Sequence, residues 1–244
     1  MKHAQQPVTT NERFGVRIDV AGTFSNSFAS GPNVIKTLPE QLAEKLVELI
    51  INGVFEPGQR LHEVGLAEQF SVSRGPVREA LRLLEREGLV TMASRKGAAV
   101  TQLTSKNLRD IFSVRSALMG ICAEELARHQ SAEVQSTLDE GTRALFVAHE
   151  AGDVAGFLVV VYQVSMYVAE ASGNEIAKSI LFSLGRQTLS ITRRVFEVPE
   201  HRLMWATDWK EIAEAIRAED PVRARQSVRR LLDDTSKAAV AIYE

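Results

Sequence analysis

Residues 61–101 alternate short amphipathic stretches with tight turns, in an order that few folds accommodate. A brief helix is predicted over EVGLAEQF (63–70), followed by a turn over SVSRGP (71–76) and a longer helix that stops at Gly88. The apolar side chains spaced to pack these helices together are Leu66, Phe70, Val72, Val77, Leu81 and Leu84. LVTMASRKGAAVTQL (89–103) then predicts a β-hairpin. This order of elements predicts a helix-turn-helix with a hairpin wing.

One side of the second helix is predicted to carry a stripe of positive charge. Its arginines recur at every fourth residue: Arg74, Arg78, Arg82 and Arg86. Guanidinium groups in this arrangement can pair with phosphates or grip a guanine edge in the major groove. Arg74 and Arg78 lie nearest the start of the helix and would approach the bases most closely, whereas the later two can instead pair with Glu79 and Glu85. An isolated stripe of this kind is commonly a solvated helix face, but the turn and the basic hairpin favour DNA binding.

The residues that flank the stripe fit the same function. Ser73 can cap the second helix with its hydroxyl, and Pro76 is tolerated in the first turn because amides there lack intrahelical partners. Arg95 and Lys96 fall at the hairpin tip, where a wing touches the DNA backbone or the minor groove, and Gly97 lets the tip turn tightly. We therefore predict that this segment binds double-stranded DNA.

The whole chain is predicted to be mainly α-helical and divided into three parts. Residues 1–36 are polar and irregular, and we expect a flexible arm or a tail without a role. Residues 37–103 form the winged module, which begins with a helix over 38–55. Residues 104–244 show about six amphipathic segments and no strand signal, so they predict an all-α bundle. The breaks are expected at 130–131, 152–153, 172–174, 198–199 and 220–221.

Composition narrows the class of protein further. The chain has 244 residues, of which 45% are hydrophobic and 25% charged, as in globular proteins. No apolar run reaches the roughly 20 residues of a membrane span, and no signal peptide pattern opens the chain. Cys122 is the single cysteine, which excludes an intrachain disulfide framework and favours the cytoplasm. The net charge of −2 means that DNA must be met by a local basic patch.

The residues LHEVGLAEQFSVSRGPVREALRLLEREGLV (61–90), followed by RKGAAV (95–100), closely resemble the winged helix-turn-helix of GntR-type bacterial transcription regulators. The resemblance runs from about Leu38 to Leu103, and VSRGPVREAL (72–81) carries most of it. It implies that the operator is touched by Ser73, Arg74, Arg78, Arg95, Lys96 and Gly97. Gly75 and Arg82, on the same helix, complete the candidate DNA-binding residues. In some relatives an arginine of the preceding helix also contacts DNA; Val64 stands there in this chain.

Residues 105–240 resemble the FCD subgroup, named after the helical C-terminal domain of FadR. The matching stretches are IFSVRSALMGICAEELA (111–127), DVAGFLVVVYQVSMYVAEASGN (153–174) and DWKEIAEAIRAEDPVRARQSVRRLL (208–232). The resemblance implies a homodimer in which a small molecule, bound inside the helical domain, changes the affinity for DNA.

Many members of that subgroup hold a divalent metal with one aspartate and three histidines. The corresponding positions in this chain are Val161, Ser165, Trp209 and Leu231, and three of these side chains cannot ligate a metal. No Asp is followed by a His four residues later anywhere in 104–244. We therefore expect neither a metal nor a cofactor.

Loss of the ligands predicts an apolar cavity at the same four positions. A carboxylate ligand in this cavity would need a positive charge, which Arg115 could supply; relatives also place an arginine there. Met119 stands where a glutamate is frequent and adds apolar surface. The alternative is that Val161, Trp209 and Leu231 fill the space and nothing binds.

Three functions follow. The favoured one is a cytoplasmic, homodimeric repressor that reads an inverted-repeat operator and responds to a partly apolar effector of unknown identity. The second is a constitutive DNA-binding dimer with a filled helical domain. The third, an enzyme with an attached DNA-binding module, has little support. The sequence contains no paired catalytic carboxylates, nucleophile elbow, phosphate-binding glycine loop or zinc signature, and Cys122 reads as a small buried hydrophobe.

Overall fold

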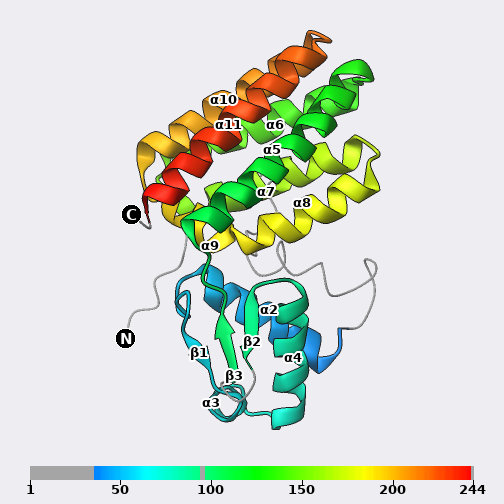
Figure 1. The fold of residues 1–244 in the computed structure, drawn as a ribbon. Helices are drawn as coiled ribbons and strands as arrows, with labels where there is room; N and C mark the ends of the chain where they lie inside the picture. The colour runs from blue at the N-terminus through cyan, green and yellow to red at the C-terminus, as the bar shows by residue number, and fades with distance from the viewer. Residues whose placement is uncertain (1–35, 94–96, 243–244) are drawn as a thin grey trace.

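The computed structural model describes residues 36–93 and 97–242. The described chain has two parts, a small N-terminal module and a larger helical domain, joined by one extended strand of backbone (Figure 1). The architecture is mainly α-helical, with one three-stranded sheet in the N-terminal module, which confirms the predicted fold class. The predicted arm over residues 1–36 lies outside the described residues, except for Lys36.

The N-terminal module has the predicted order of elements. These are α2 (Leu38–Ile51), β1 (Arg60–Leu61), α3 (Glu63–Gln69), α4 (Arg74–Arg86), β2 (Val90–Ala93) and β3 (Gly97–Val100). The sheet has the order β1-β3-β2, with both neighbouring pairs antiparallel. The hairpin of β2 and β3 therefore extends from the module as a wing beside α4 (Figure 1).

Apolar packing holds the helix-turn-helix together. Val77, Leu81 and Leu84 line the inner side of α4 and are buried, with Leu66 of α3 packed in the same core. Phe70 and Val72, in the turn, are half-buried against it. Since these residues occupy one side of α4, the opposite side with its arginines faces solvent.

One detail of this turn differs from the prediction. Ser73 occupies the N-cap position of α4 with an extended backbone, but its hydroxyl makes no cap hydrogen bond. Ser73 is exposed, so water can satisfy the first amides of α4 in place of the hydroxyl.

The helical domain contains seven helices within its described residues. They are α5 (Ser105–Arg128), α6 (Ala132–Glu150), α7 (Val154–Ala171), α8 (Glu175–Gln187), α9 (Leu189–Val195), α10 (Pro199–Arg217) and α11 (Pro221–Ala241). Side-chain caps start five of them, at Thr104, Ser131, Asp153, Asn174 and Asp220. The bounds of the helices place a break at every position where one was predicted.

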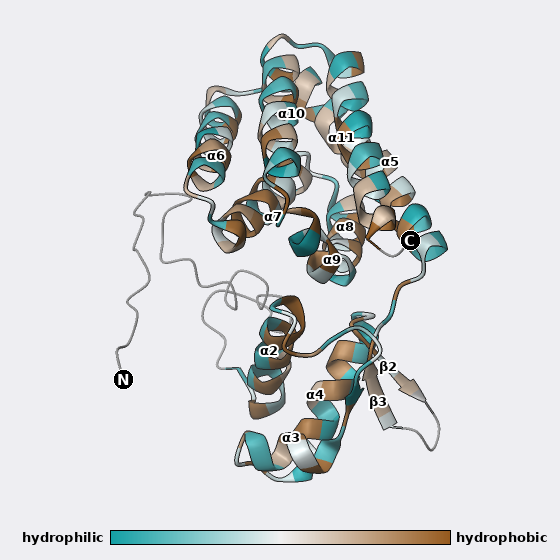
Figure 2. Cartoon of the chain, turned by 90° about the vertical axis from the view of Figure 1, so that its left-hand side faces the viewer, coloured by the Kyte–Doolittle hydropathy of each residue, from teal (hydrophilic) through white to brown (hydrophobic). Residues whose placement is uncertain are grey.

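In the helical domain, α7 packs against α5, α6, α8 and α9 and supplies many of the buried residues of the core; Figure 2 shows the helices of this domain. Phe157 of α7 stacks edge-on against Phe196, which stacks in the same way against Trp205, with ring centroids 4.9 Å and 5.2 Å apart. The indole Nε1 of Trp205 donates to the hydroxyl of Thr235 at 2.8 Å. By length and composition α7 could also cross a membrane, but most of it is buried against neighbouring helices, as in the core of a globular domain.

An extra break separates α8 from α9 at Thr188, which the sequence did not indicate. The fully buried Thr188 hydroxyl donates to the carbonyl oxygens of Leu184 and Gly185, at 3.2 Å and 3.1 Å. The same hydroxyl accepts a hydrogen bond from the guanidinium of Arg115 at 2.9 Å. A threonine hydroxyl that bonds backward competes with the helical pattern, and here it places the break beside Arg115.

Candidate nucleic-acid interface and ligand cavity

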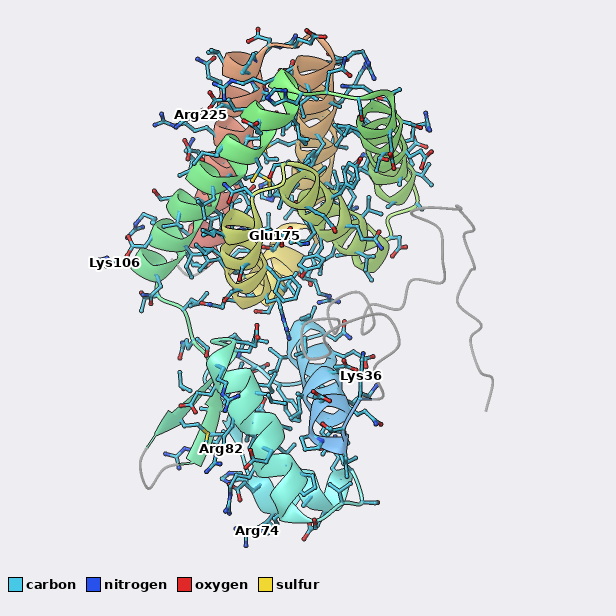
Figure 3. The ribbon with its side chains drawn as sticks, turned by 90° about the vertical axis from the view of Figure 1, so that its right-hand side faces the viewer. Lys36, Arg74, Arg82, Lys106, Glu175 and Arg225 are labelled. Atoms are coloured by element: carbon cyan, nitrogen blue, oxygen red, sulfur yellow. The ribbon has the colours of Figure 1, made fainter. Side chains whose placement is uncertain are left out.

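The outer side of α4 presents the predicted arginine stripe to solvent. The side chains of Arg74, Arg78 and Arg82 are 61%, 48% and 55% exposed. Arg74 projects from the end of the module farthest from the helical domain, and Arg82 lies about midway along the module (Figure 3). Ser73 and Gly75 are exposed in the same first turn, and a Cβ on Gly75 would meet no atom within 4 Å. The first turn of α4 is thus open to a large ligand.

Glu63, which the sequence reasoning missed, holds the two leading arginines. Its carboxylate accepts two hydrogen bonds from Arg78, from Nε at 3.1 Å and from Nη2 at 3.0 Å. Arg74 lies at 3.5 Å from the same carboxylate. The bidentate bond to Arg78 holds the pKa of Glu63 below its usual range. Glu63 begins α3, so it fixes Arg78 across the helix-turn-helix.

The predicted pairing further along the stripe is present for Arg82, whose Nη1 lies 3.0 Å from Glu79 Oε1. This pair is exposed at both ends, so it contributes little to stability and leaves Arg82 accessible. Val64 is exposed on α3, where it offers no charge to DNA.

The structure describes the two strands of the wing but not the residues between them. Gly97 begins β3 with a φ of +78°, in the left-handed region that favours glycine, as the predicted tight tip requires. Arg95 and Lys96 lie outside the described residues.

A narrow cavity in the helical domain brings together four of the six predicted pocket residues, Arg115, Met119, Val161 and Ser165. The other side chains that line it are Leu158, Tyr162, Met166, Leu181, Gly185, Leu189 and Thr192. Trp209 and Leu231 are buried, but they are not among the residues that line this cavity. The sequence comparison placed them by helix register, which does not fix how far a side chain lies from a cavity.

The one guanidinium of the cavity wall is held by few partners. Arg115 donates from Nη1 to Thr188, and its carbon Cζ lies 5.2 Å from the ring centroid of Phe112. Its Nε is buried and has no hydrogen-bond partner among the described residues. Burial lowers the pKa of Arg115 to about 10, so the side chain stays protonated at neutral pH. An anion would therefore find an under-coordinated cation in an apolar surrounding.

The cavity is small, and its donor atoms do not suit a metal. About 20 Å³ is open to a molecule the size of water, so a larger ligand requires flexible side chains such as Met119 and Met166 to move. The hydroxyl of Ser165 already donates to the carbonyl of Val161 at 2.7 Å. Across residues 36–93 and 97–242, no three His, Cys, Asp or Glu side chains gather as a metal site would require. The residues present do not fit the divalent metal of the FCD subgroup.

A winged helix-turn-helix with an exposed arginine stripe, joined to a helical domain, defines the class of DNA-binding transcription regulators. Comparison with known families identifies the branch of this class. Residues 38–100 match "Bacterial regulatory proteins, gntR family", and residues 110–234 match the FCD domain. The chain therefore belongs to the GntR family of bacterial transcription regulators and carries an FCD domain.

Individual relatives agree with this assignment. An uncharacterized HTH-type transcriptional regulator of Bacillus subtilis, YdhC, is 41% identical over 100 residues, which are 41% of this chain and 44% of that protein. A second HTH-type regulator, from Agrobacterium vitis, is 30% identical over 160 residues, 64% of this chain and 84% of that protein. The gluconate operon transcriptional repressor of Bacillus licheniformis is 40% identical over 91 residues, 37% of each chain.

Solved structures show the same fold across the molecule. The Escherichia coli protein McbR/YncC superposes with a TM-score of 0.73 at 21% identity, covering 86% of this chain and all of the other. A GntR regulator from Rhodococcus sp. RHA1 gives 0.73 at 20% identity, covering 84% of this chain and 99% of the other.

Proposed function

We propose that this chain is a cytoplasmic repressor whose module over residues 37–103 binds an inverted-repeat operator and whose helical domain over residues 104–244 dimerises and binds an effector. The exposed stripe of Arg74, Arg78 and Arg82 on the outer side of α4 is the observation that carries the proposal. The leading turn of α4 would enter the major groove, and the wing tip with Arg95 and Lys96 would reach the adjacent backbone. A repressor is favoured because matched relatives include proteins named as repressors.

Operator binding is tested by selecting duplexes from a random pool, together with the promoter next to the gene, and measuring affinity by fluorescence anisotropy. Arg78→Ala is expected to weaken operator binding about 5- to 150-fold, the range for losing one bidentate base contact. Arg229→Ala is a matched control, since Arg229 is an exposed arginine that also faces a carboxylate, Asp233, but lies on α11. Intact operator binding by Arg78→Ala, or no duplex bound by the wild type, would overturn the proposal.

Dimerisation is proposed through the joined outer faces of α5 and α8. Four large apolar side chains are exposed there: Val114 and Ile121 of α5, and Ile176 and Ile180 of α8. Helical spacing aligns them along each helix, and Ile176 is 76% exposed, which is unfavourable in a monomer. A second copy packed on this face would bury the patch and present two modules to the half-sites of an operator. Ile176→Arg should yield monomers in sedimentation, whereas Val222→Arg, an exposed apolar site on α11, should not.

The effector is proposed to be a small carboxylate with an apolar body. Arg115 supplies the charge and Met119, Leu158 and Leu181 supply the apolar wall. The buried, unpartnered Nε of Arg115 supports this assignment. Octanoate and benzoate are suitable probes, because binding to the folded state raises the melting temperature of the wild type.

The narrowness of the cavity favours one second candidate, a constitutive repressor whose helical domain binds no ligand. The two are distinguished by comparing the wild type with Arg115→Met in the same thermal series. Stabilisation by a carboxylate that Arg115→Met abolishes supports the effector, while unchanged melting across a broad carboxylate panel supports the constitutive regulator.

A further inference from the structure

The two parts of the chain meet where α4 ends against the end of α8. Glu87, just after α4, places Oε2 3.5 Å from Nη1 of Arg186 on α8. The next residues also meet, because a Cβ on Gly88 would lie 2.8 Å from Cδ of Gln187. Gly88 has a φ of +73° and no side chain, so it allows α8 to approach the end of the recognition helix. This junction is continuous with the helix that contacts DNA in the proposed function.

Arg186 is an unusual side chain for a domain junction because it is 0% exposed. Desolvation lowers its pKa, whereas the negative charges of Glu87 on α4 and Glu44 on α2 favour its protonated form. Both carboxylates belong to the N-terminal module. The positive charge of a residue in the helical domain is therefore favoured by two acidic residues of the other part.

Neighbouring residues connect Arg186 to the cavity beside Arg115. Gly185, the preceding residue, lines the cavity, and a Cβ on it would lie 3.9 Å from the ring of Tyr162. The guanidinium carbon of Arg186 lies 5.6 Å from the ring centroid of Phe182, which stacks edge-on against Tyr162 at 6.1 Å. Tyr162 itself lines the cavity beside Arg115, and burial raises the pKa of its hydroxyl while the charge of Arg186 opposes that rise.

We propose that Arg186 is a positioning residue that couples occupancy of the cavity to the orientation of the recognition helix. This inference rests on the proposed function and names its route of regulation. An anion bound at Arg115 adds negative charge on the cavity side of Arg186 and displaces Tyr162, so the hold of Glu87 on Arg186 weakens. The end of α4 is then released from α8. By linkage, operator binding changes the affinity for the anion by the same factor.

A static clamp between the two parts would show the same contacts, so the test must detect communication across Arg186. Tyr162→Phe removes one hydroxyl on the cavity side, and Glu87→Gln removes the charge on the α4 side. Operator affinity is measured for the wild type, both single variants and the double variant. Non-additive effects with a coupling of at least about threefold support the relay, and additive effects overturn it.

Control variants distinguish a loss of coupling from a general loss of stability or of DNA binding. Glu85→Gln removes a carboxylate from the last turn of α4 outside this junction, and its combination with Tyr162→Phe should be additive. Glu87→Asp retains the charge but shortens the side chain, so it tests the coupling if Glu87→Gln unfolds. Arg186→Lys should restore part of the coupling that Arg186→Met abolishes, because it keeps the charge.

A second measurement needs neither operator nor effector. The amides of Gly88 and Leu89 are bonded to the carbonyls of Glu85 and Leu84, so their hydrogen exchange reports opening at the end of α4. Tyr162→Phe should speed this exchange about threefold or more without affecting α11; unchanged exchange would overturn the relay. A wild type that binds no duplex, together with faster exchange in Tyr162→Phe, would refute the proposed function and leave the relay standing.

Discussion

The two parts of this molecule place the same side chain in opposite environments. On α4, Arg74, Arg78 and Arg82 are about half exposed and meet carboxylates that are themselves partly hydrated. In the helical domain, Arg186 is fully buried and the Nε of Arg115 has lost its water. Exposed ion pairs are weak and exchange partners easily, whereas a buried cation strongly resists losing its partner. The arginines of α4 can therefore exchange their carboxylate partners for DNA phosphates, while Arg186 keeps its partner.

The largest expected effect tests the buried side of this comparison. Glu87→Gln should lower the free energy of unfolding by about 3 kcal/mol, because it removes the carboxylate that pairs with the buried charge of Arg186. Arg186→Met should be less harmful, because Glu87 is partly exposed and regains water. Urea denaturation measures both, with Glu85→Gln as the control that should change stability by less than about 0.5 kcal/mol. Equal losses for Glu87→Gln and Arg186→Met would contradict this account of the junction.

A smaller effect is expected at Arg115, where the structure places no carboxylate partner among the described residues. Arg115→Met should leave the free energy of unfolding unchanged or raise it by up to about 1 kcal/mol, since a desolvated cation is replaced by apolar volume. Urea denaturation without added carboxylates gives the measurement. A loss above about 2 kcal/mol would mean that Arg115 is held by stronger interactions than its bond to Thr188.

The smallest effect on stability is expected on the exposed side. Glu63→Ala should change the free energy of unfolding by less than about 0.5 kcal/mol, because its pairs with Arg78 and Arg74 are accessible to solvent. It should nevertheless raise affinity for random-sequence DNA about threefold and reduce preference for the operator. The positive charge of Arg78 is then no longer offset by a carboxylate, and its orientation is no longer fixed.

The pH dependence of that effect follows from the lowered pKa of Glu63. The pKa of Glu63 is lower in the folded protein than in the unfolded chain. Its carboxylate is therefore ionised and paired at any pH above the ordinary pKa of a glutamate, and the pairing is lost only as the pH falls through the lowered pKa. The effect of Glu63→Ala on DNA affinity, measured by anisotropy, should therefore be constant between about pH 6 and pH 8. Glu79→Ala is the matched control, because Glu79 pairs with Arg82 and not with Arg78. If Glu79→Ala and Glu63→Ala changed the preference for the operator equally, Glu63 would not orient Arg78.

The sequence alone determined the order of elements, because local signals specify it. Asp153, Asn174 and Asp220 cap helices at positions where breaks were expected, and the apolar positions Val77, Leu81 and Leu84 placed the arginines on the outer side of α4. Caps and periodicity act over three or four residues, so they can be read from a single chain.

Only the tertiary structure decided the pairings that give those residues their roles. Glu63 meets Arg78 across a turn, and Arg186 meets Glu87 across nearly a hundred residues, with no periodicity to indicate either pair. The break at Thr188 depends on a bond to Arg115 from another helix, and Trp209 is buried without lining the cavity. Contacts between distant segments depend on how helices cross and how closely side chains pack, and neither is encoded in local sequence spacing.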